Sequence, residues 1–275
     1  MALSPARMRS LSQFDQIVCG VDEAGRGPWA GPVVVAAVVL PRTLRIEGLA
    51  DSKVLSHKVR CELFEHIVAE AAVSTVVVAA RRVDEMNIRA ATLWGMRRAV
   101  ATLPVRPSVA LIDGRDVPDG LCVKGRALVG GDGRSTAIAA ASIVAKVTRD
   151  RLMTQLARAF PHYGFERHKG YGTPEHRAAL ALHGPCVHHR RSFAPIRACL
   201  GSAGDVRTAP APCDTAPAEA AFAETGIEYA DAAFEDATLG EIEPVAAVRE
   251  PRARRVPPQR PAKRLAPATA ARRTG

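Results

Sequence analysis

The stretch IVCGVDEAGRGPWAGPVVVAAVVL, residues 17–40, decides the fold. It contains two short apolar, β-branched runs, 17–22 and 33–40, separated by glycines and prolines that are typical of a turn. We therefore expect two paired strands joined as a hairpin. The longest uncharged run, residues 27–41, is too short to cross a bilayer as a helix and is interrupted by Pro28 and Pro32.

Beyond this hairpin, strand-like and helix-like patterns alternate along the chain. Apolar residues at helical spacing, such as Leu55 and Val59, predict a helix that begins near Ser56, and Asp84 is a suitable N-cap for the next helix. The alternation predicts an α/β domain with a mixed sheet flanked by helices. The further elements that we expect are strands at 74–80 and 108–113, and helices at 55–72, 84–103, 136–160 and 174–183. The alanine-rich start of the helix at 136–160, AIAAAS, would let that helix lie close to the sheet.

The composition changes near residue 204. The residues after it hold nine of the twenty prolines and are rich in alanine. The net charge is +11 over residues 1–204, −9 over 205–243 and +8 over 244–275. A segment with such charge blocks and few large apolar side chains cannot offset the entropy lost on ordering. We therefore expect a short flexible N-terminus at 1–14, a folded domain at 15–204 and a disordered tail at 205–275.

The overall composition excludes several classes of protein. With 275 residues, 47% of them hydrophobic, the chain can bury its own core. Neither a secretory signal nor a membrane-spanning run is present in the sequence, so we expect a cytoplasmic protein with no membrane partner. The six cysteines form no CxxC pair and are expected to be free thiols. The net charge of +10 favours an anionic partner such as nucleic acid.

Carboxylates occur at three places where the chain is expected to turn. Asp22 and Glu23 end the first strand, Asp113 ends an apolar strand, and Asp132 lies in a glycine-rich turn before the long helix. Each has a simpler interpretation on its own: a charged hairpin turn, an Asp-Gly turn, or a favourable charge at a helix N-terminus. The functional interpretation depends on all of them converging.

Together these acids supply hard oxygen ligands, which suit Mg²⁺ or Mn²⁺ rather than zinc. Two such ions about 4 Å apart can activate a water and stabilise the leaving oxygen of a phosphodiester. A basic protein around an acidic centre suits a nuclease, because cations attract the nucleic-acid backbone and carboxylates hold the metals. No Ser/His/Asp, Cys/His, P-loop or dinucleotide motif competes with this interpretation.

An ordered set of motifs between about Ile17 and Leu200 resembles bacterial ribonuclease HII, the type 2 ribonuclease H family. The set covers most of the expected folded domain. The motifs are DEAGRGP with AGP from residue 22, DSK with LS from residue 51, IDG from residue 112, IAAASIVAKVTRD from residue 138, YGF from residue 163, HKGY from residue 168 and HHRRSF from residue 188.

This resemblance implies a ribonuclease H-like mixed β-sheet flanked by helices, with a C-terminal helical part. It also implies an endoribonuclease that hydrolyses the RNA strand of RNA–DNA hybrids and cuts on the 5′ side of ribonucleotides embedded in duplex DNA. The products would carry a 3′-hydroxyl and a 5′-phosphate, and the cofactor would be Mn²⁺ or Mg²⁺. Such an enzyme would serve ribonucleotide removal and RNA primer processing, and we expect it to be a monomer.

The resemblance assigns roles to individual residues. Four acids would be the catalytic metal ligands: Asp22, Glu23, Asp113 and Asp132. The loop of Gly25, Arg26 and Gly27 would read the 2′-hydroxyl of the substrate. Tyr171 would pack on the neighbouring sugar, and Lys53 and Lys146 would contact phosphates. We expect the cluster His188-His189-Arg190-Arg191 to lie on a basic surface near the substrate, because arginines beside a metal site would oppose the cation.

Three positions depart from the family pattern. Gly130 stands where a lysine usually precedes Gly-Asp, Val54 replaces a second lysine, and Trp29 replaces a smaller aliphatic residue. The tail at 205–275 has no counterpart in the family core. It also lacks the glutamine and paired aromatics of a sliding-clamp-binding motif.

Two alternatives remain. Ribonuclease HIII carries an extra N-terminal substrate-binding domain and lacks an intact Gly-Arg-Gly; we expect the short segment before Asp22 to leave no room for that domain. A non-catalytic module with the same fold could bind RNA–DNA hybrids. Such a module would be expected to have lost an acid, because an acidic cluster costs stability unless a metal neutralises it, and all four candidates are present.

Overall fold

The structure, a computed structural model, describes residues 17–42, 44, 48–49 and 55–201. Within this range it contains a five-stranded mixed sheet in the order β3-β2-β1-β4-β5. The strands are β1 (Val18–Ala24), β2 (Val33–Val39), β3 (Ala72–Val78), β4 (Val109–Asp113) and β5 (Lys124–Leu128). The expected domain boundaries near 15 and 204, the N-terminus 1–14 and the tail 205–275 lie outside the described residues and stay predictions.

The expected hairpin forms the centre of the sheet. β1 pairs antiparallel with β2, Gly20 facing Val38 and Ala24 facing Val34, and β2 pairs antiparallel with β3. On its other side β1 pairs parallel with β4, which in turn pairs parallel with β5. Every residue of β2 is buried, as expected for a strand covered on both faces. The predicted mixed α/β sheet is therefore confirmed.

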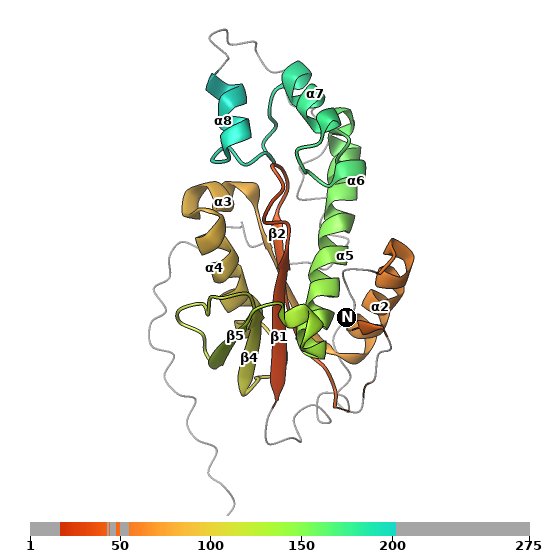
Figure 1. Ribbon diagram of the computed structural model, residues 1–275, viewed down its shortest axis with the longest axis vertical. Helices are drawn as coiled ribbons and strands as arrows, with labels where there is room; N and C mark the ends of the chain where they lie inside the picture. The colour runs from red at the N-terminus through yellow and green to blue at the C-terminus, as the bar shows by residue number, and fades with distance from the viewer. Residues whose placement is uncertain (1–16, 43, 45–47, 50–54, 202–275) are drawn as a thin grey trace, which may run out of the picture. The chain divides into compact units, whose positions relative to one another are not determined.

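Helices cover both faces of the sheet (Figure 1). On one face lie α2 (His57–Glu70) and the long α5 (Thr136–Ala159), and on the other lie α3 (Ala80–Met86) and α4 (Ile88–Ala101). Two separate apolar clusters fill these layers. None of the described helices is both long and apolar enough to span a membrane.

The alanine-rich start of α5 lies directly against β1, as its sequence predicted. Ala139, Ala140 and Ala141 have no exposed surface. A Cβ added to Gly20 would stand 2.1 Å from the backbone of Ala137, so the strand needs a glycine where the helix crosses it. This close contact fixes the N-terminal end of α5 beside the strand that carries Asp22.

The predicted helix at 84–103 was wrong as a single element. The chain breaks at Asn87, where φ is +68°, and the Asn87 side chain accepts hydrogen bonds from the backbone of Arg89 and Ala90 to cap α4. Asp84 is therefore not an N-cap: it lies inside α3. Its carboxylate instead accepts hydrogen bonds from the backbone nitrogens of Arg191 and Ser192 and from the Ser192 hydroxyl.

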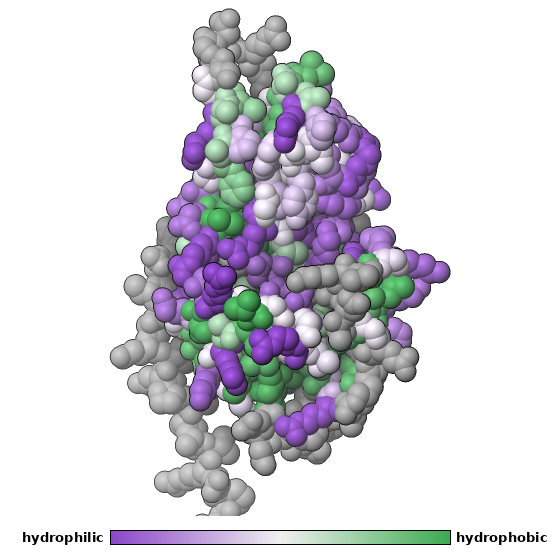
Figure 2. All heavy atoms as spheres, viewed as in Figure 1, coloured by the Kyte–Doolittle hydropathy of each residue, from purple (hydrophilic) through white to green (hydrophobic). Residues whose placement is uncertain are grey.

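The C-terminal helical part packs against the far half of α5. It consists of the short helices η3 (Pro161–Tyr163) and α6 (Phe165–His168), followed by α7 (Pro174–His183) and α8 (Ala194–Gly201). A third apolar cluster, centred on Phe165, Met153 and Ile196, joins these helices to α5. Figure 2 shows hydrophilic side chains across the middle of one face and apolar ones at the ends of α7 and α8, where Leu182 is 75% exposed.

Candidate functional site

The first two acids, Asp22 and Glu23, lie near the C-terminal end of β1. The strand continues through both residues to Ala24, so it does not end at Asp22 as the sequence suggested. The backbone nitrogen of Glu23 donates to Asp22 Oδ1 at 2.7 Å, and Arg26 Nη1 lies 3.3 Å from Glu23 Oε1. The other oxygen, Glu23 Oε2, is buried and has no hydrogen-bond partner. One carboxylate oxygen thus lacks the partner that a bound cation could supply.

The other two acids approach from the neighbouring strand and the following turn. Because Val21 pairs with Ile112, Asp113 at the end of β4 lies level with Asp22. Asp113 Oδ1 accepts a hydrogen bond of 2.7 Å from Gly131, the residue before Asp132. Asp132 is 6% exposed and lies in η2 (Gly131–Gly133), directly before α5. The structure therefore brings the acids of β1, β4 and η2 to one end of the sheet.

The replacement of the usual lysine by Gly130 does not disturb this turn. Gly130 has φ +60°, in the left-handed region that favours glycine. Gly131 permits a close approach, because a Cβ there would stand 2.5 Å from the Ile138 side chain and 3.2 Å from Asp113 Oδ1. The two glycines allow the turn to reach Asp113 and to present Asp132 beside it.

The carboxylates repel one another. Burial, followed by the charges of Glu23 and Asp113, raises the pKa of Asp22 well above its ordinary value. Burial likewise raises the pKa of Glu23, and the Arg26 guanidinium opposes that shift. Within the described part of the chain no three His, Cys, Asp or Glu side chains are already arranged to hold one metal ion. The acids nevertheless offer a concentration of negative charge that a divalent cation would relieve.

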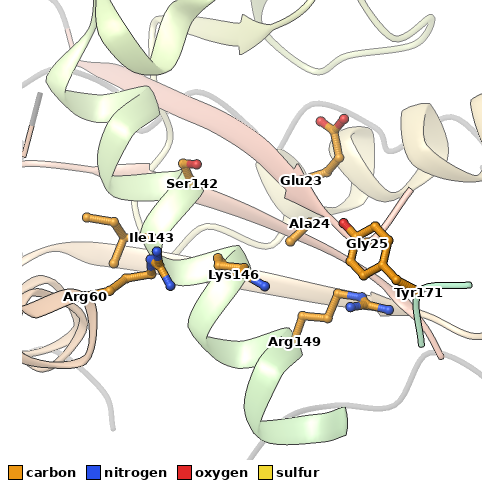
Figure 3. A pocket seen from close by; sticks show the side chains of 9 residues that line it. All are labelled: Glu23, Ala24, Gly25, Arg60, Ser142, Ile143, Lys146, Arg149 and Tyr171. Atoms are coloured by element: carbon orange, nitrogen blue, oxygen red, sulfur yellow. The ribbon is translucent and has the colours of Figure 1, made fainter. Parts of the chain in front are cut away.

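A cavity of about 390 Å³ opens beside Glu23 (Figure 3). Figure 3 shows Lys146 and Arg149 extending from α5 toward Gly25 and Tyr171. The predicted residues Glu23, Gly25, Lys146 and Tyr171 thus line one cavity. The remaining lining residues are Ala24, Arg60, Ser142, Ile143 and Arg149.

Two of these basic residues were missed by the sequence analysis. Arg60 reaches the cavity from α2, and its Nη2 donates to the backbone carbonyl of Leu55 at 2.9 Å. That bond holds the side chain at the cavity. Arg149 belongs to the AKVTRD motif, but no role followed from the sequence. Lys146 Nζ is held 2.6 Å from Asp150 Oδ1, so both predicted and unpredicted cations are anchored.

The loop that carries Gly25, Arg26 and Gly27 passes in front of Tyr171. A Cβ added to Gly27 would stand 3.6 Å from Tyr171 Cε1, and Tyr171 is 49% exposed. Arg26 also lines a second, smaller cavity together with Asp113. Predicted residues for sugar recognition are therefore adjacent to one another and to the acids. Lys53 lies outside the described residues.

Two buried arginines hold this loop and the chain that follows it in place. Arg190 donates five hydrogen bonds, 2.6–3.1 Å long, to the carbonyls of Gly25, Arg26, Pro28 and Gly31. Arg149 donates to the carbonyls of Pro32, Ala30 and Lys169 at 2.9–3.1 Å. Arg190 is completely buried and Arg149 is 1% exposed. Both guanidinium groups thus bind backbone oxygens within the protein.

The prediction that His188-His189-Arg190-Arg191 forms a basic surface was therefore wrong. Of the four, only Arg191 is exposed, while His189 and Arg190 are buried in the interior between α5, α7 and the loop. The sequence could not show this, because the carbonyls that bind Arg190 lie 159–165 residues earlier in the chain. Phe193, which lies 5.2 Å under the Arg190 guanidinium, belongs to the same motif.

Comparison with known proteins gives a consistent result. The sequence model of the ribonuclease HII family matches residues 19–196. Ribonuclease HII of Burkholderia thailandensis is 57% identical over 183 residues, 66% of this chain and 85% of that protein. The ribonuclease H2 structure from Pyrococcus horikoshii OT3 has a TM-score of 0.60 at 27% identity and covers 67% of this chain and 97% of that one. The PCNA:RNase HII complex from Archaeoglobus fulgidus gives 0.57 at 29% identity, over 64% and 95% of the two chains.

Proposed function

The chain belongs to the ribonuclease HII family and is a ribonuclease H enzyme that acts on nucleic acid, and we propose that it cuts at ribonucleotides embedded in duplex DNA. The cut lies on the 5′ side of the ribonucleotide and leaves a 3′-hydroxyl and a 5′-phosphate. The same site hydrolyses the RNA strand of RNA–DNA hybrids. The observation that carries this proposal is the proximity of the Asp22, Glu23 and Asp113 carboxylates to the loop of Gly25, Arg26 and Gly27.

Asp22, Glu23, Asp113 and Asp132 would hold Mg²⁺ or Mn²⁺. Their oxygens are the donors these ions prefer, and Glu23 Oε2 is buried without a partner. Burial, followed by the charges of Glu23 and Asp113, raises the pKa of Asp22, and a cation would favour its ionised form. A bound divalent ion supplies an activated water and stabilises the leaving oxygen of the phosphodiester.

The loop of Gly25, Arg26 and Gly27 and the side chain of Tyr171 recognise the ribose. The 2′-hydroxyl is the group that distinguishes RNA from DNA at one position. Gly25 has φ +95°, and glycines let the loop backbone approach the sugar closely. Tyr171, half-exposed beside Gly27, packs on the next sugar and reports a missing hydroxyl. The Arg26 side chain is half-exposed beside Glu23, so its guanidinium can reach a phosphate at the site. In this proposal Arg26 holds that phosphate.

Cations along the cavity hold the nucleic-acid backbone. Lys146 and Arg60 are both fixed by a hydrogen bond and both face the cavity, so they contact phosphates with little further ordering. Lys53 is proposed as a further phosphate contact. We propose that the protein acts as a monomer in the cytoplasm.

Replacement of Asp113 by Asn tests the catalytic assignment against the hybrid-binding alternative. Asp113→Asn abolishes cleavage of a duplex with one ribonucleotide and leaves duplex binding within about threefold, because the amide keeps the bond from Gly131 but loses the charge. Asp119→Asn, in an exposed loop, is the matched control and cleaves as the wild type does. Cleavage unchanged in Asp113→Asn would refute the metal-site assignment.

A further inference from the structure

We propose that a buried chain of hydrogen bonds through His189 and His176 positions Tyr171 against the substrate sugar. These two histidines are then positioning residues: they act through Tyr171 and touch no reacting atom. The inference rests on the proposed function, in which Tyr171 recognises the sugar, and it assigns a role to residues that the catalytic proposal does not use.

The Tyr171 side chain is exposed while its backbone is held on both sides. Its nitrogen donates to the carbonyl of His168 at 2.9 Å. Its carbonyl accepts from the Thr173 nitrogen at 2.8 Å and lies 2.9 Å from His176 Nδ1. A fully bonded backbone fixes the place from which the ring is presented, so little backbone freedom is lost when a sugar packs on it.

Only one arrangement of protons satisfies this chain when the histidines are neutral. The Cys186 nitrogen donates to His189 Nδ1 at 3.0 Å, so His189 carries its proton on Nε2. His189 Nε2 lies 3.0 Å from His176 Nε2 and donates to it. His176 then carries its proton on Nδ1 and donates to the Tyr171 carbonyl, which can only accept. The chain runs from one backbone nitrogen to one backbone oxygen, and both ends are fixed.

The surroundings keep both histidines neutral. His176 and His189 are 0% and 1% exposed, and burial lowers the pKa of both, that of His189 to about 3. Burial raises the pKa of the Cys186 thiol to about 11, so the group near His189 Nδ1 is uncharged. Protonation of His176 would set its Nε2–H against that of His189 over 3.0 Å, and protonation of His189 would set its Nδ1–H against the Cys186 N–H over 3.0 Å. The hydrogen-bond direction is therefore well defined at neutral pH.

A third histidine holds the residue before Tyr171. The Gly170 nitrogen donates to His168 Nδ1 at 3.2 Å, and His168 Nε2 lies 2.7 Å from the carbonyl of Tyr163. His168 stacks on His176 with ring centroids 4.5 Å apart. Lys169 has φ +51°, a left-handed conformation that this network keeps in place. The turn that presents Tyr171 is thus strained and supported by three buried imidazoles.

The neighbouring residue links this chain to the other half of the recognition site. Arg190 follows His189 directly and donates to the loop of Gly25, Arg26 and Gly27. The dipeptide His189-Arg190 therefore fixes Tyr171 on one side and the loop on the other. This arrangement accounts for the 3.6 Å approach of Tyr171 to the Cβ position of Gly27.

Two isosteric variants of His176 separate positioning from general stability. In His176→Asn the amide nitrogen takes the place of Nδ1 and still donates to the Tyr171 carbonyl. In His176→Gln the amide reaches the Nε2 position and binds His189, but the bond to Tyr171 is lost. Each variant loses one buried hydrogen bond, so both lose similar stability. His183→Asn, exposed near the end of the same helix, is the control.

We expect kcat/KM on a single-ribonucleotide duplex to fall about tenfold in His176→Gln and less than about threefold in His176→Asn. In the Tyr171→Ala background, His176→Gln has no further effect, because the side chain it positions is gone. Equal losses in the Asn and Gln variants, or additive losses with Tyr171→Ala, would overturn the proposal.

A spectroscopic measurement distinguishes failure of this inference from failure of the proposed function. In ¹⁵N-labelled wild-type protein, imidazole shifts should show a proton on Nδ1 of His176 and on Nε2 of His189. The opposite tautomers would overturn the chain even in an active enzyme. Wild-type protein that shows these tautomers but cleaves no ribonucleotide-containing duplex would refute the function and leave the chain itself supported.

Discussion

Replacement of Arg190 by Met should destabilise the protein and loosen its recognition of ribonucleotides. Arg190 donates to four carbonyls, and those of Pro28 and Gly31 are bonded to it in buried surroundings. A buried carbonyl left without a partner costs about 1–3 kcal/mol, so these two predict a loss of about 2–6 kcal/mol. That is a large part of the about 5–15 kcal/mol by which a domain is ordinarily stable.

Urea unfolding followed by circular dichroism measures this loss. Arg158→Met, exposed in the last turn of α5, is the matched control and should change stability by less than about 0.5 kcal/mol. Because Arg190 also bonds the carbonyls of Gly25 and Arg26, the folded Arg190→Met protein should discriminate less between ribonucleotide-containing and all-DNA duplexes. A loss below about 1 kcal/mol with unchanged discrimination would refute the reasoning that this guanidinium holds the loop.

Three further predictions follow from the charges and the chain organisation. The raised pKa of Asp22 means that the native protein binds more protons there than the unfolded chain, so the wild type loses stability as the pH rises above the ordinary carboxyl pKa of about 4. In metal-free protein the advantage of Asp22→Asn over wild type should therefore grow as the pH rises above about 4, and Mg²⁺ should cancel it. The lowered pKa of buried His176 has the opposite effect on the pH dependence of stability, because the unfolded chain binds the proton more tightly than the native protein does. Urea titrations should show wild type losing stability faster than His176→Asn as the pH falls below about 6.5, and parallel curves would contradict this. Deleting residues 205–275 should leave the single-turnover rate within about twofold, since the family match ends at residue 196, and a larger loss would show that the tail contributes to the site.

Local patterns were sufficient to predict the centre of the fold. The two apolar runs and the Gly/Pro-rich turn between them gave β1 and β2, and Ser56 caps α2 as expected, accepting from Val59. The alanine-rich start of α5 predicted its close contact with the sheet. These features depend on neighbours in the sequence, where periodicity and capping act directly.

The strand β5 was missed for a physical reason. Its sequence, KGRAL, has neither an apolar run nor an alternation of apolar and polar residues. The strand forms because it pairs with the edge of β4, where Lys124 lies opposite Val109 and Leu128 opposite Asp113. The break at Asn87 was missed because a residue in the left-handed region interrupts a pattern that otherwise reads as one helix. A tertiary contact decided the structure of β5, whereas the break at Asn87 comes from a local cap, in which the Asn87 side chain accepts from the nitrogens of Arg89 and Ala90.

The position of the acids at expected chain turns was enough to predict them from the sequence. The residues that support the site could not be predicted in this way. Arg190 and His189 read as exposed basic residues because buried arginines and histidines are uncommon. The partners of Arg190 are backbone carbonyls of a distant segment, such as that of Gly25, and no side-chain pattern marks a carbonyl as an acceptor. Arg60 was missed in the same way, since its helical position gives no sign of the cavity it faces.

The most direct test of the account is cleavage of a labelled DNA duplex that carries one internal ribonucleotide, with Mg²⁺, with Mn²⁺ and with EDTA. An all-DNA duplex and an RNA–DNA hybrid are the comparison substrates. The account predicts a metal-dependent cut on the 5′ side of the ribonucleotide, with a 3′-hydroxyl product, and no cut in the all-DNA duplex. A folded protein that binds the duplex but cuts it with neither metal would contradict the proposal and favour the hybrid-binding module.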